Sequence, residues 1–418
     1  MTKLITNIKQ LVGVRQQNKL LRGKGLAELP SIENAYLIIE DGLIAEYGPM
    51  KNLESETSNA KHQTSNTIDA TDQFILPCWC DSHTHLVFAA SREEEFVDKI
   101  KGTGYAEIAA KGGGILNSAK RLNDISEAQL FDLSWKRLAE IARLGTGAVE
   151  IKSGYGLTVE GELKMLRVIK KLKEKSALSI KSTFLGAHNY PIEYREDHKG
   201  YIDLIVNEML PVIAVEKLAD YIDVFCENGF FSPAEAEIIC RAGMSYGLKP
   251  KLHVNQLNSI GGVQIGIELN AVSLDHLEVL TDDDIKLVSS SWSGVCTLLP
   301  TAAFFLGVPF QPAKKLIEAG CAIALATDYN PGSSPSGNMS LVIAMSCIGM
   351  KMLPEESINA ATNNGAWAIE LQHEVGSITV GKKANLIFTQ PIPSLAYLPY
   401  SFGTNLIDRV MINGEFVS

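Results

Sequence analysis

The stretch YIDVFCENGFFSPAEAEIICRAGMSYGLKPKLHVNQL, residues 221–257, contains one complete strand–helix–strand unit. Residues 221–229 have the apolar run of a buried strand and end in a Gly-containing turn. Ser232, followed by proline and then by Glu235 three residues after the cap, predicts a helix start of the capping-box type. A glycine and a proline end that helix, and residues 251–257 resume as a strand. This order of elements is typical of a parallel sheet covered by helices.

The same order recurs along the middle of the chain. Residues 148–156 predict a strand, and residues 160–175 predict a helix with leucine and isoleucine recurring on one face. Apolar strands are expected to begin near residues 74, 147, 182, 221, 250, 271, 294 and 321. About eight such strands are the number needed to close a barrel. We therefore predict an α/β protein with a (β/α)8, TIM-like barrel.

The two ends of the chain have a different pattern, in which short strands alternate with turns. Residues 35–48 read as a hairpin around an Asp-Gly turn, and residues 409–418 contain an Asn-Gly turn of the same kind. Residues 376–389 also alternate strand and turn. We predict that residues 1–74 and 378–418 together build one small β-sandwich domain, and that residues 75–377 form the barrel.

The composition limits the partners that the protein can have. The 418 residues carry a formal net charge of −10, and no basic stripe is present to bind a phosphate backbone. We expect a small-molecule substrate, with no nucleic acid and no membrane, because no apolar run reaches the ~18 residues of a membrane-spanning helix. The N-terminus does not resemble a signal peptide. Seven scattered cysteines fit a reducing cytoplasm, and we interpret Cys78 and Cys80 as buried thiols rather than as metal ligands.

Polar side chains follow the predicted strands at their carboxyl ends, which is where barrel enzymes build their active sites. In WCDSHTHLVFAASRE, residues 79–93, two histidines stand two positions apart, so their imidazoles project from the same face of a strand. The other polar residues at strand ends are Tyr155, His188, His253, His276 and Asp328. Neutral imidazole and carboxylate oxygen are ligands that zinc and iron accept, and such a set leaves room for water. We predict one metal ion held by His83, His85, His253 and Asp328.

This pattern resembles the amidohydrolase superfamily, in which an H-x-H pair, a histidine on each of two later strands and an aspartate on the eighth strand recur. More specific segments are similar to the imidazolonepropionases: EIKSGYGL (150–157), LGAHNYP (185–191), ATDYNPGSSP (326–335) and Arg92. The resemblance covers nearly the whole chain. It implies hydrolytic ring opening of 4-imidazolone-5-propanoate to N-formimidoyl-L-glutamate in histidine degradation, with one zinc or iron ion per subunit. It also suggests a homodimer.

The resemblance implies a role for each site residue. Asp328, a metal ligand, is placed to take a proton from water and pass it to the leaving ring nitrogen. His276 is expected to hydrogen-bond the carbonyl oxygen as charge develops there. Arg92 offers a bidentate fork for the propionate carboxylate, which Tyr155 is also expected to reach. The remaining expected substrate contacts are His188, Gln256, Asn330, Gly332 and Ser333.

Several alternatives remain open at the level of sequence. A deaminase acting on a heterocyclic base would share the metal site, although Gln256 stands where deaminases of the superfamily usually carry glutamate, and an amide cannot carry a proton. A catalytically inactive barrel used for assembly would have lost metal ligands. Arg92 could be a solvated surface residue, and Tyr155 could be an ordinary core residue. Glu227 could in principle bridge a second metal, but one metal is our prediction.

Overall fold

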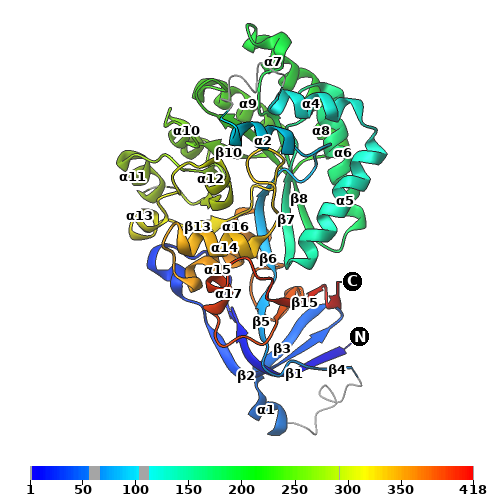
Figure 1. Cartoon of the computed structure of the whole chain (residues 1–418), viewed down its shortest axis with the longest axis vertical. Coiled ribbons are helices and arrows are strands. Elements are labelled where there is room, and N and C mark those ends of the chain that lie inside the picture. The colour runs from blue at the N-terminus through cyan, green and yellow to red at the C-terminus, as the bar shows by residue number, and fades with distance from the viewer. Residues whose placement is uncertain (1, 56–65, 103–112, 291, 418) are drawn as a thin grey trace.

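The computed structural model describes residues 2–55, 66–102, 113–290 and 292–417. These residues form two sheets of eight strands each. One sheet closes into a barrel surrounded by helices, and the other lies below it and contains strands from both ends of the chain (Figure 1). The predicted fold class, a TIM-like barrel joined to a small β unit built from both ends of the chain, is confirmed; the described strands of that unit, predicted as a sandwich, form one mixed sheet.

The barrel sheet is parallel and its strands follow one another in chain order. They are β6 (Trp79–Thr84), β7 (Thr146–Lys152), β8 (Ser179–Ala187), β9 (Tyr221–Cys226), β10 (Lys249–Val254), β11 (Ser273–His276), β12 (Val295–Leu298) and β13 (Ile323–Leu325). The segment after β13 closes the ring against β6. Thr84 and Tyr329 form a parallel bridge there, and the backbone N–H of Thr327 donates to Asp81 Oδ1 at 3.0 Å.

Helices cover the outside of the barrel (Figure 1). The capping boxes at Ser126 and Ser232 start two of them, and the second was expected from the sequence. The helices of the barrel are α2 (Glu93–Ile100), α4 (Ile115–Asp124), α5 (Glu127–Arg143), α6 (Val159–Lys175), α7 (His198–Leu204), α8 (Leu210–Glu216), α9 (Pro233–Ser245), α10 (Gly262–Glu268), α11 (Asp282–Ser290), α12 (Pro300–Leu306), α13 (Ala313–Glu318), α14 (Met339–Ile348), α15 (Pro354–Ala361) and α16 (Asn363–Ala368). Among the described residues, no helix combines the length and apolar character needed to span a membrane.

The second sheet is mixed and joins the two ends of the chain. Its strands are β1 (Thr2–Val12), β2 (Ser31–Glu40), β3 (Leu43–Pro49), β4 (Thr67–Asp69), β5 (Phe74–Pro77), β14 (Leu386–Thr389), β15 (Ile407–Ile412) and β16 (Glu415–Phe416). Two short helices, α1 (Met50–Ser55) and α17 (Tyr397–Tyr400), accompany it. In the centre of the sheet, β5 pairs in parallel with β1 and antiparallel with β14. Side chains from β1, β2, β5, β14 and β15 meet in one apolar cluster.

The junction between the two sheets lies within one apolar run. Residues expected to form a single strand from about residue 74 are divided: β5 belongs to the mixed sheet and β6 to the barrel. Figure 1 shows β5 leading from the lower sheet directly into β6. The first barrel strand therefore starts a few residues later than expected. The division of the chain into 1–74 plus 378–418 and 75–377 stays a prediction.

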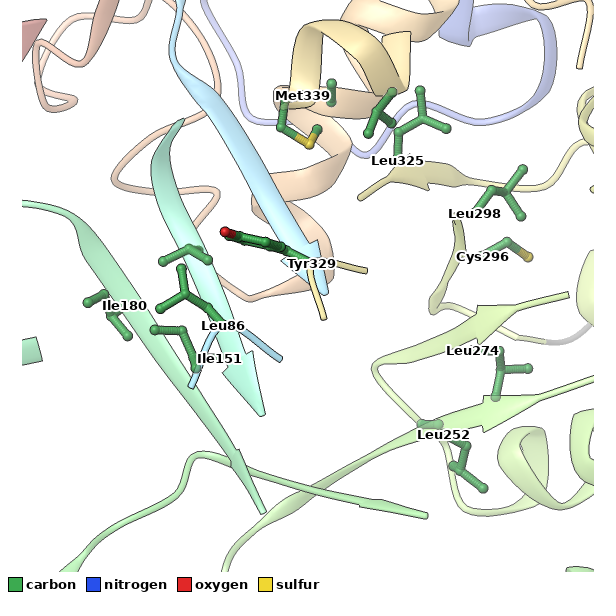
Figure 2. Close-up of a cluster of buried hydrophobic side chains, with 14 of the residues drawn as sticks. Leu86, Ile151, Ile180, Leu252, Leu274, Cys296, Leu298, Leu325, Tyr329 and Met339 are labelled. Atoms are coloured by element: carbon green, nitrogen blue, oxygen red, sulfur yellow. The ribbon is translucent and has the colours of Figure 1, made fainter. Parts of the chain in front are cut away.

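The apolar core surrounds the barrel, whereas the barrel interior is polar. Ile151, Leu252 and Leu274, on three of the barrel strands, belong to the large apolar cluster, ten members of which are labelled in Figure 2. The residues next to them in sequence point to the opposite side of each strand. On that side lie charged residues such as Glu150 and Lys251, whose side chains contact each other across the barrel at 2.7 Å. The barrel thus replaces the usual apolar filling with ionic groups.

Candidate metal centre and active site

The four candidate metal ligands meet at the carboxyl ends of three strands. His83 is on β6 and His85 follows it, His253 is on β10, and Asp328 follows β13. All four side chains are buried. Asp328 Oδ1 lies 3.5 Å from His85 Nε2 and 3.6 Å from His83 Nε2, and the Nε2 atoms of His85 and His253 are 3.3 Å apart. The structure therefore brings together the residues that the sequence assigned to one metal.

The donor atoms of this cluster fit a metal ion. Ligand atoms of His83, His85 and His253 lie within 4.8 Å of one another, and the same holds for His83, His276 and Asp328. Burial is the largest of several effects that hold the pKa of all three candidate ligand histidines well below 6.5, so these imidazoles are neutral, which is the form that binds metals. His83 Nε2 has no hydrogen-bond partner in the part of the chain that the structure describes. Nitrogen and carboxylate donors in this number suit zinc or iron.

A second layer of carboxylates orients two of these imidazoles. Asp275 Oδ2 lies 2.7 Å from His83 Nδ1, and Asp223 Oδ2 lies 2.9 Å from His253 Nδ1. The contact at His83 is a hydrogen bond, which fixes the ring and leaves Nε2 directed at the metal position. The contact at His253 Nδ1 lacks hydrogen-bond geometry, but Asp223 also holds this residue by accepting its backbone N–H at Oδ1, at 3.1 Å. Sequence reasoning did not identify these two aspartates. The signal for them was a charged residue within an otherwise apolar strand, as in YIDVF (221–225) and SLDH (273–276).

His276 and Asp328 both have backbone conformations that are unusual for residues other than glycine. Their φ angles are +84° and +52°, in the left-handed region where side chains are strained. His276 Nδ1 lies 3.4 Å from Glu278 Oε1. Burial opposes a charge on His276, but the carboxylates of Glu278, Asp328 and Asp275 together outweigh it and raise the pKa of the imidazole. Burial raises the pKa of Asp328 to about 6.

A cavity of about 400 Å³ opens beside this cluster. Three candidate ligands (His85, His253 and Asp328) line it together with His276, and so do all the residues expected to contact substrate: Arg92, Tyr155, His188, Gln256, Asn330, Gly332 and Ser333. Ile115, Phe225, Phe230, Leu257, Leu306 and Val308 complete the lining. The structure thus places every expected substrate contact around one cavity, although their roles stay predictions.

Arg92 lies at the cavity and is not solvated: its side chain is 10% exposed. Its Nε donates to Glu95 Oε2 at 2.9 Å, and its guanidinium group lies against Gly332, where an added Cβ would come within 2.4 Å of Nη1. Tyr155 is buried beside His85 and His188, with ring centroids 5.8 and 5.4 Å away. The position of Arg92 therefore does not favour its interpretation as a surface residue. The position of Tyr155 does not favour its interpretation as an ordinary core residue.

His188 is fixed by the turn after β7. Its Nδ1–H donates to the carbonyl of Gly154 at 2.9 Å, and its ring stacks on His85 with an interplanar angle of 16°. Burial lowers its pKa to about 4, so the ring is neutral. The hydrogen bond at Nδ1 leaves Nε2 as the atom of this ring that can meet a ligand.

The loop after β13 is organised by Asn330. Its Oδ1 accepts the backbone N–H groups of Gly332 and Ser333 at 2.8 Å each, and its Nδ2 donates to the carbonyl of Asp328 at 2.6 Å. Ser333 Oγ donates to Asp328 Oδ2 at 3.3 Å. These bonds place the loop next to Asp328, the candidate general base. They also engage the backbone N–H groups of Gly332 and Ser333, two of the residues expected to contact the substrate.

Gln256 belongs to a loop held by Glu227, which is 1% exposed. Glu227 Oε2 accepts the N–H groups of Leu257 and Asn258 at 2.8 and 3.2 Å, and its Oε1 accepts the N–H of Asn228 at 2.8 Å and Nδ2 of Asn258 at 3.0 Å. Both oxygens are thus engaged by the loop. A bridge between two metals through Glu227 is not favoured, and one metal stays our prediction.

The fold and this cluster together are those of an amidohydrolase. A model of the amidohydrolase family matches residues 248–417. Among solved structures, a guanine deaminase from E. coli aligns with a TM-score of 0.75 over 100% of this chain and 99% of that chain at 15% identity. An adenosine deaminase from Xanthomonas campestris with bound zinc aligns with a TM-score of 0.71 over 99% of this chain and 92% of that chain at 17% identity. At these identities the likeness is one of fold alone.

Closer relatives give the particular family. The chain is 56% identical to the imidazolonepropionase of Flavobacterium johnsoniae and 55% identical to that of Christiangramia forsetii, over 100% of both chains in each case. It is 41% identical to the imidazolonepropionase of Parabacteroides distasonis, over 99% of this chain and 98% of that protein. The chain belongs to the imidazolonepropionase family.

Proposed function

We propose that this protein hydrolyses 4-imidazolone-5-propanoate to N-formimidoyl-L-glutamate, the ring-opening step of histidine degradation. The observation that carries this proposal is the cavity itself. Three of the four candidate ligands line it, together with Arg92, whose side chain is 10% exposed, and other polar groups. Such a cavity suits a small ring that carries a carboxylate. Full-length identity to imidazolonepropionases supports the same reaction.

The proposed cofactor is one zinc or iron ion per subunit, held by His83, His85, His253 and Asp328. When bound, a metal ion of this kind lowers the pKa of water and polarises a carbonyl group. The neutral imidazoles and the contacts of His83 and His253 with buried carboxylates support these ligands.

Asp328 is the proposed carrier of the proton. In the reaction, water adds its oxygen to the ring carbonyl carbon, the bond from that carbon to the adjacent ring nitrogen breaks, and the nitrogen gains a proton. Asp328 takes the proton from the water and delivers it to the leaving nitrogen. His276, kept toward its protonated form by Glu278, donates a hydrogen bond to the carbonyl oxygen as negative charge develops.

The propionate end of the substrate is proposed to bind Arg92. Its guanidinium group lies against Gly332, where the lack of a side chain makes room for it. Tyr155, His188, Gln256, Asn330 and Ser333 are the proposed further contacts, and all of them line the same cavity. Gln256 can both donate and accept a hydrogen bond, so it suits the amide-like edge of the ring.

The test is consumption of freshly generated 4-imidazolone-5-propanoate, followed by its ultraviolet absorbance. Protein as purified, after chelation, and after return of zinc or iron should be compared. We expect loss of the substrate and formation of N-formimidoyl-L-glutamate only in the protein that holds metal. Ammonia release from purine, pyrimidine or triazine bases, with no consumption of the imidazolone, would contradict the proposal and favour a deaminase.

A homodimer in the cytoplasm completes the proposal. All seven cysteines are free, and six of them are buried, which suits a reducing compartment. The resemblance to imidazolonepropionases supports the dimer. Sedimentation equilibrium of the purified protein tests that assembly, and a monomeric mass would contradict it.

A further inference from the structure

Lys152 is a fully buried lysine at the end of β7, and it does not line the cavity. Its Nζ lies 2.7 Å from Glu150 Oε1, 2.8 Å from Asp223 Oδ2 and 3.5 Å from Asp275 Oδ2. Burial opposes its charge, but the three carboxylates outweigh this effect and raise its pKa. A charged ammonium group therefore lies inside the barrel, beneath the candidate metal ligands.

The carboxylate oxygens that meet Lys152 are the same atoms that meet the ligand imidazoles. Asp275 Oδ2 contacts both Lys152 Nζ and His83 Nδ1. Asp223 Oδ2 contacts both Lys152 Nζ and His253 Nδ1. One ammonium group thus joins the carboxylate that hydrogen-bonds the ring of His83 and the carboxylate that contacts the ring and binds the backbone N–H of His253. These histidines come from β6 and β10, which are not neighbours in the sheet.

Without Lys152, Asp223 and Asp275 would face each other as buried carboxylates with no ammonium group in direct contact with both of them. Repulsion would turn them apart, and each aspartate would carry its imidazole with it. Lys251 is the second buried lysine of this interior, but its Nζ contacts Glu150 Oε2 at 2.7 Å and the carbonyl oxygens of Ser82 and Ala368 at 3.1 and 3.2 Å. Among the described residues, Lys251 forms no ion pair with Asp223 or Asp275, although its charge acts from a greater distance to lower the pKa of both carboxyl groups.

We propose that Lys152 is a positioning residue for the metal centre: by bridging Asp223 and Asp275 it holds the imidazoles of His83 and His253 in the orientation that binds metal. This inference rests on the proposed metal site. It assigns Lys152 an effect on metal affinity and on ligand geometry rather than on substrate affinity.

The test compares Lys152→Met with Lys251→Met, which removes the same charge from the same interior. The dissociation constant for Co²⁺ is measured by competition with a chelator, and the visible spectrum of bound Co²⁺ reports the ligand geometry. We expect Lys152→Met to bind Co²⁺ roughly 10–100-fold more weakly, the usual effect of losing a residue that supports metal ligands, with an altered spectrum. Lys251→Met should lose much less affinity. The KM of Lys152→Met saturated with metal should equal that of the wild type.

Lys152→Arg provides an independent measurement, because it keeps the positive charge and changes the shape of the group. The planar guanidinium cannot replace an ammonium group among three carboxylates, so we expect weaker Co²⁺ binding here too. Wild-type affinity in Lys152→Arg would overturn the proposal. So would equal losses in Lys152→Met and Lys251→Met, since net charge would then explain both. The proposal would also be overturned if Lys152→Met did not fold while Lys251→Met did. Lys152 would then be needed for the stability of the barrel rather than for the position of the metal ligands.

The same measurements separate this inference from the proposed metal site. A wild-type protein that binds neither Co²⁺ nor Zn²⁺ would disprove the metal centre itself. A wild-type protein that binds Co²⁺, together with a Lys152→Met variant of equal affinity and unchanged spectrum, would disprove only the positioning role.

Discussion

Asp328 serves different neighbours with its two carboxylate oxygens. Oδ1 faces the Nε2 atoms of His83 and His85, while Oδ2 accepts a hydrogen bond from Ser333 Oγ. A φ angle of +52° turns the residue out of the regular strand direction. The strain is held by the hydrogen bond from Asn330 to the Asp328 carbonyl and by the backbone N–H of Asp328, which donates to the carbonyl of His83. Such over-determined strain is typical of active sites.

Replacing Asp328 by asparagine should abolish turnover. The amide keeps the shape of the side chain but can neither accept the proton nor contribute negative charge to the cluster. Proton transfer by a positioned side chain contributes about 10²–10⁴-fold to rates, so we expect kcat to fall by at least about 100-fold. Steady-state kinetics measure the loss, and circular dichroism should show an unchanged fold. Activity close to that of the wild type would refute the role of Asp328.

Replacing Arg92 by alanine should mainly raise KM. A hydrogen bond to a charged group contributes about 1.5–3 kcal/mol, which corresponds to a KM increase of roughly tenfold or more. Arg241→Ala is the matched control, because Arg241 is exposed on α9 and forms an ion pair with Glu237. Initial rates over a range of substrate concentrations separate the two parameters. A large fall in kcat with unchanged KM would instead place Arg92 at the reacting atoms.

At the scale of the element, each barrel strand has two buried faces with different chemistry. The sequence predicts which residues share a face, because side chains alternate along a strand. It does not tell which face points into the barrel. The histidines were therefore recognised from their places at strand ends, whereas Glu150, Lys152 and Lys251 were not expected as an interior network. Their contacts join strands that are distant in the chain, and no local pattern predicts such contacts.

The loop that follows β10 is held by Glu227, which lies in the loop that follows β9. Glu227→Gln should loosen the segment that carries Gln256, because an amide nitrogen faces N–H donors that a carboxylate oxygen accepts. A buried donor left unsatisfied costs about 1–3 kcal/mol. We expect a several-fold higher KM and a lower Tm, with metal affinity unchanged.

Glu237→Gln, an exposed change on α9, is the control for Glu227→Gln. If Glu227 were a metal ligand after all, the Glu227→Gln protein would lose metal affinity in the chelator competition while keeping its KM. The pattern of changed parameters therefore decides between the two roles.

At the scale of the whole molecule, the barrel and the union of the two chain ends could both be predicted from the sequence. Turn signals at Asp41-Gly42 and Asn413-Gly414 identified the terminal strands, and the repeated strand–helix order identified the barrel. The point of division could not be predicted. Residues 74–84 read as one apolar run, and only the pairing of β5 with β1 and β14 separates it from β6.

Metal removal should lower the stability of the entire protein. A ligand that binds only the folded state stabilises it by about 2.7 kcal/mol when its free concentration is 100 times its Kd. Chelation should therefore lower Tm, and addition of zinc or iron should restore it. The Asp328→Asn variant, which lacks a proposed ligand charge, should show a smaller shift. An unchanged Tm, in protein whose metal content is measured before and after chelation, would contradict a metal held by four side chains at three strand ends.

The pairing of β5 with β14 has a consequence for how the protein is made. β5 leads directly into β6, which carries His83, yet its partner β14 follows the whole barrel in the chain. During synthesis on the ribosome, the barrel strands emerge while the sheet below β6 still lacks β14 and β15. Domains usually fold from the N-terminus as they are translated. Here the sheet that anchors the first metal-binding strand is completed only after the barrel has been synthesised.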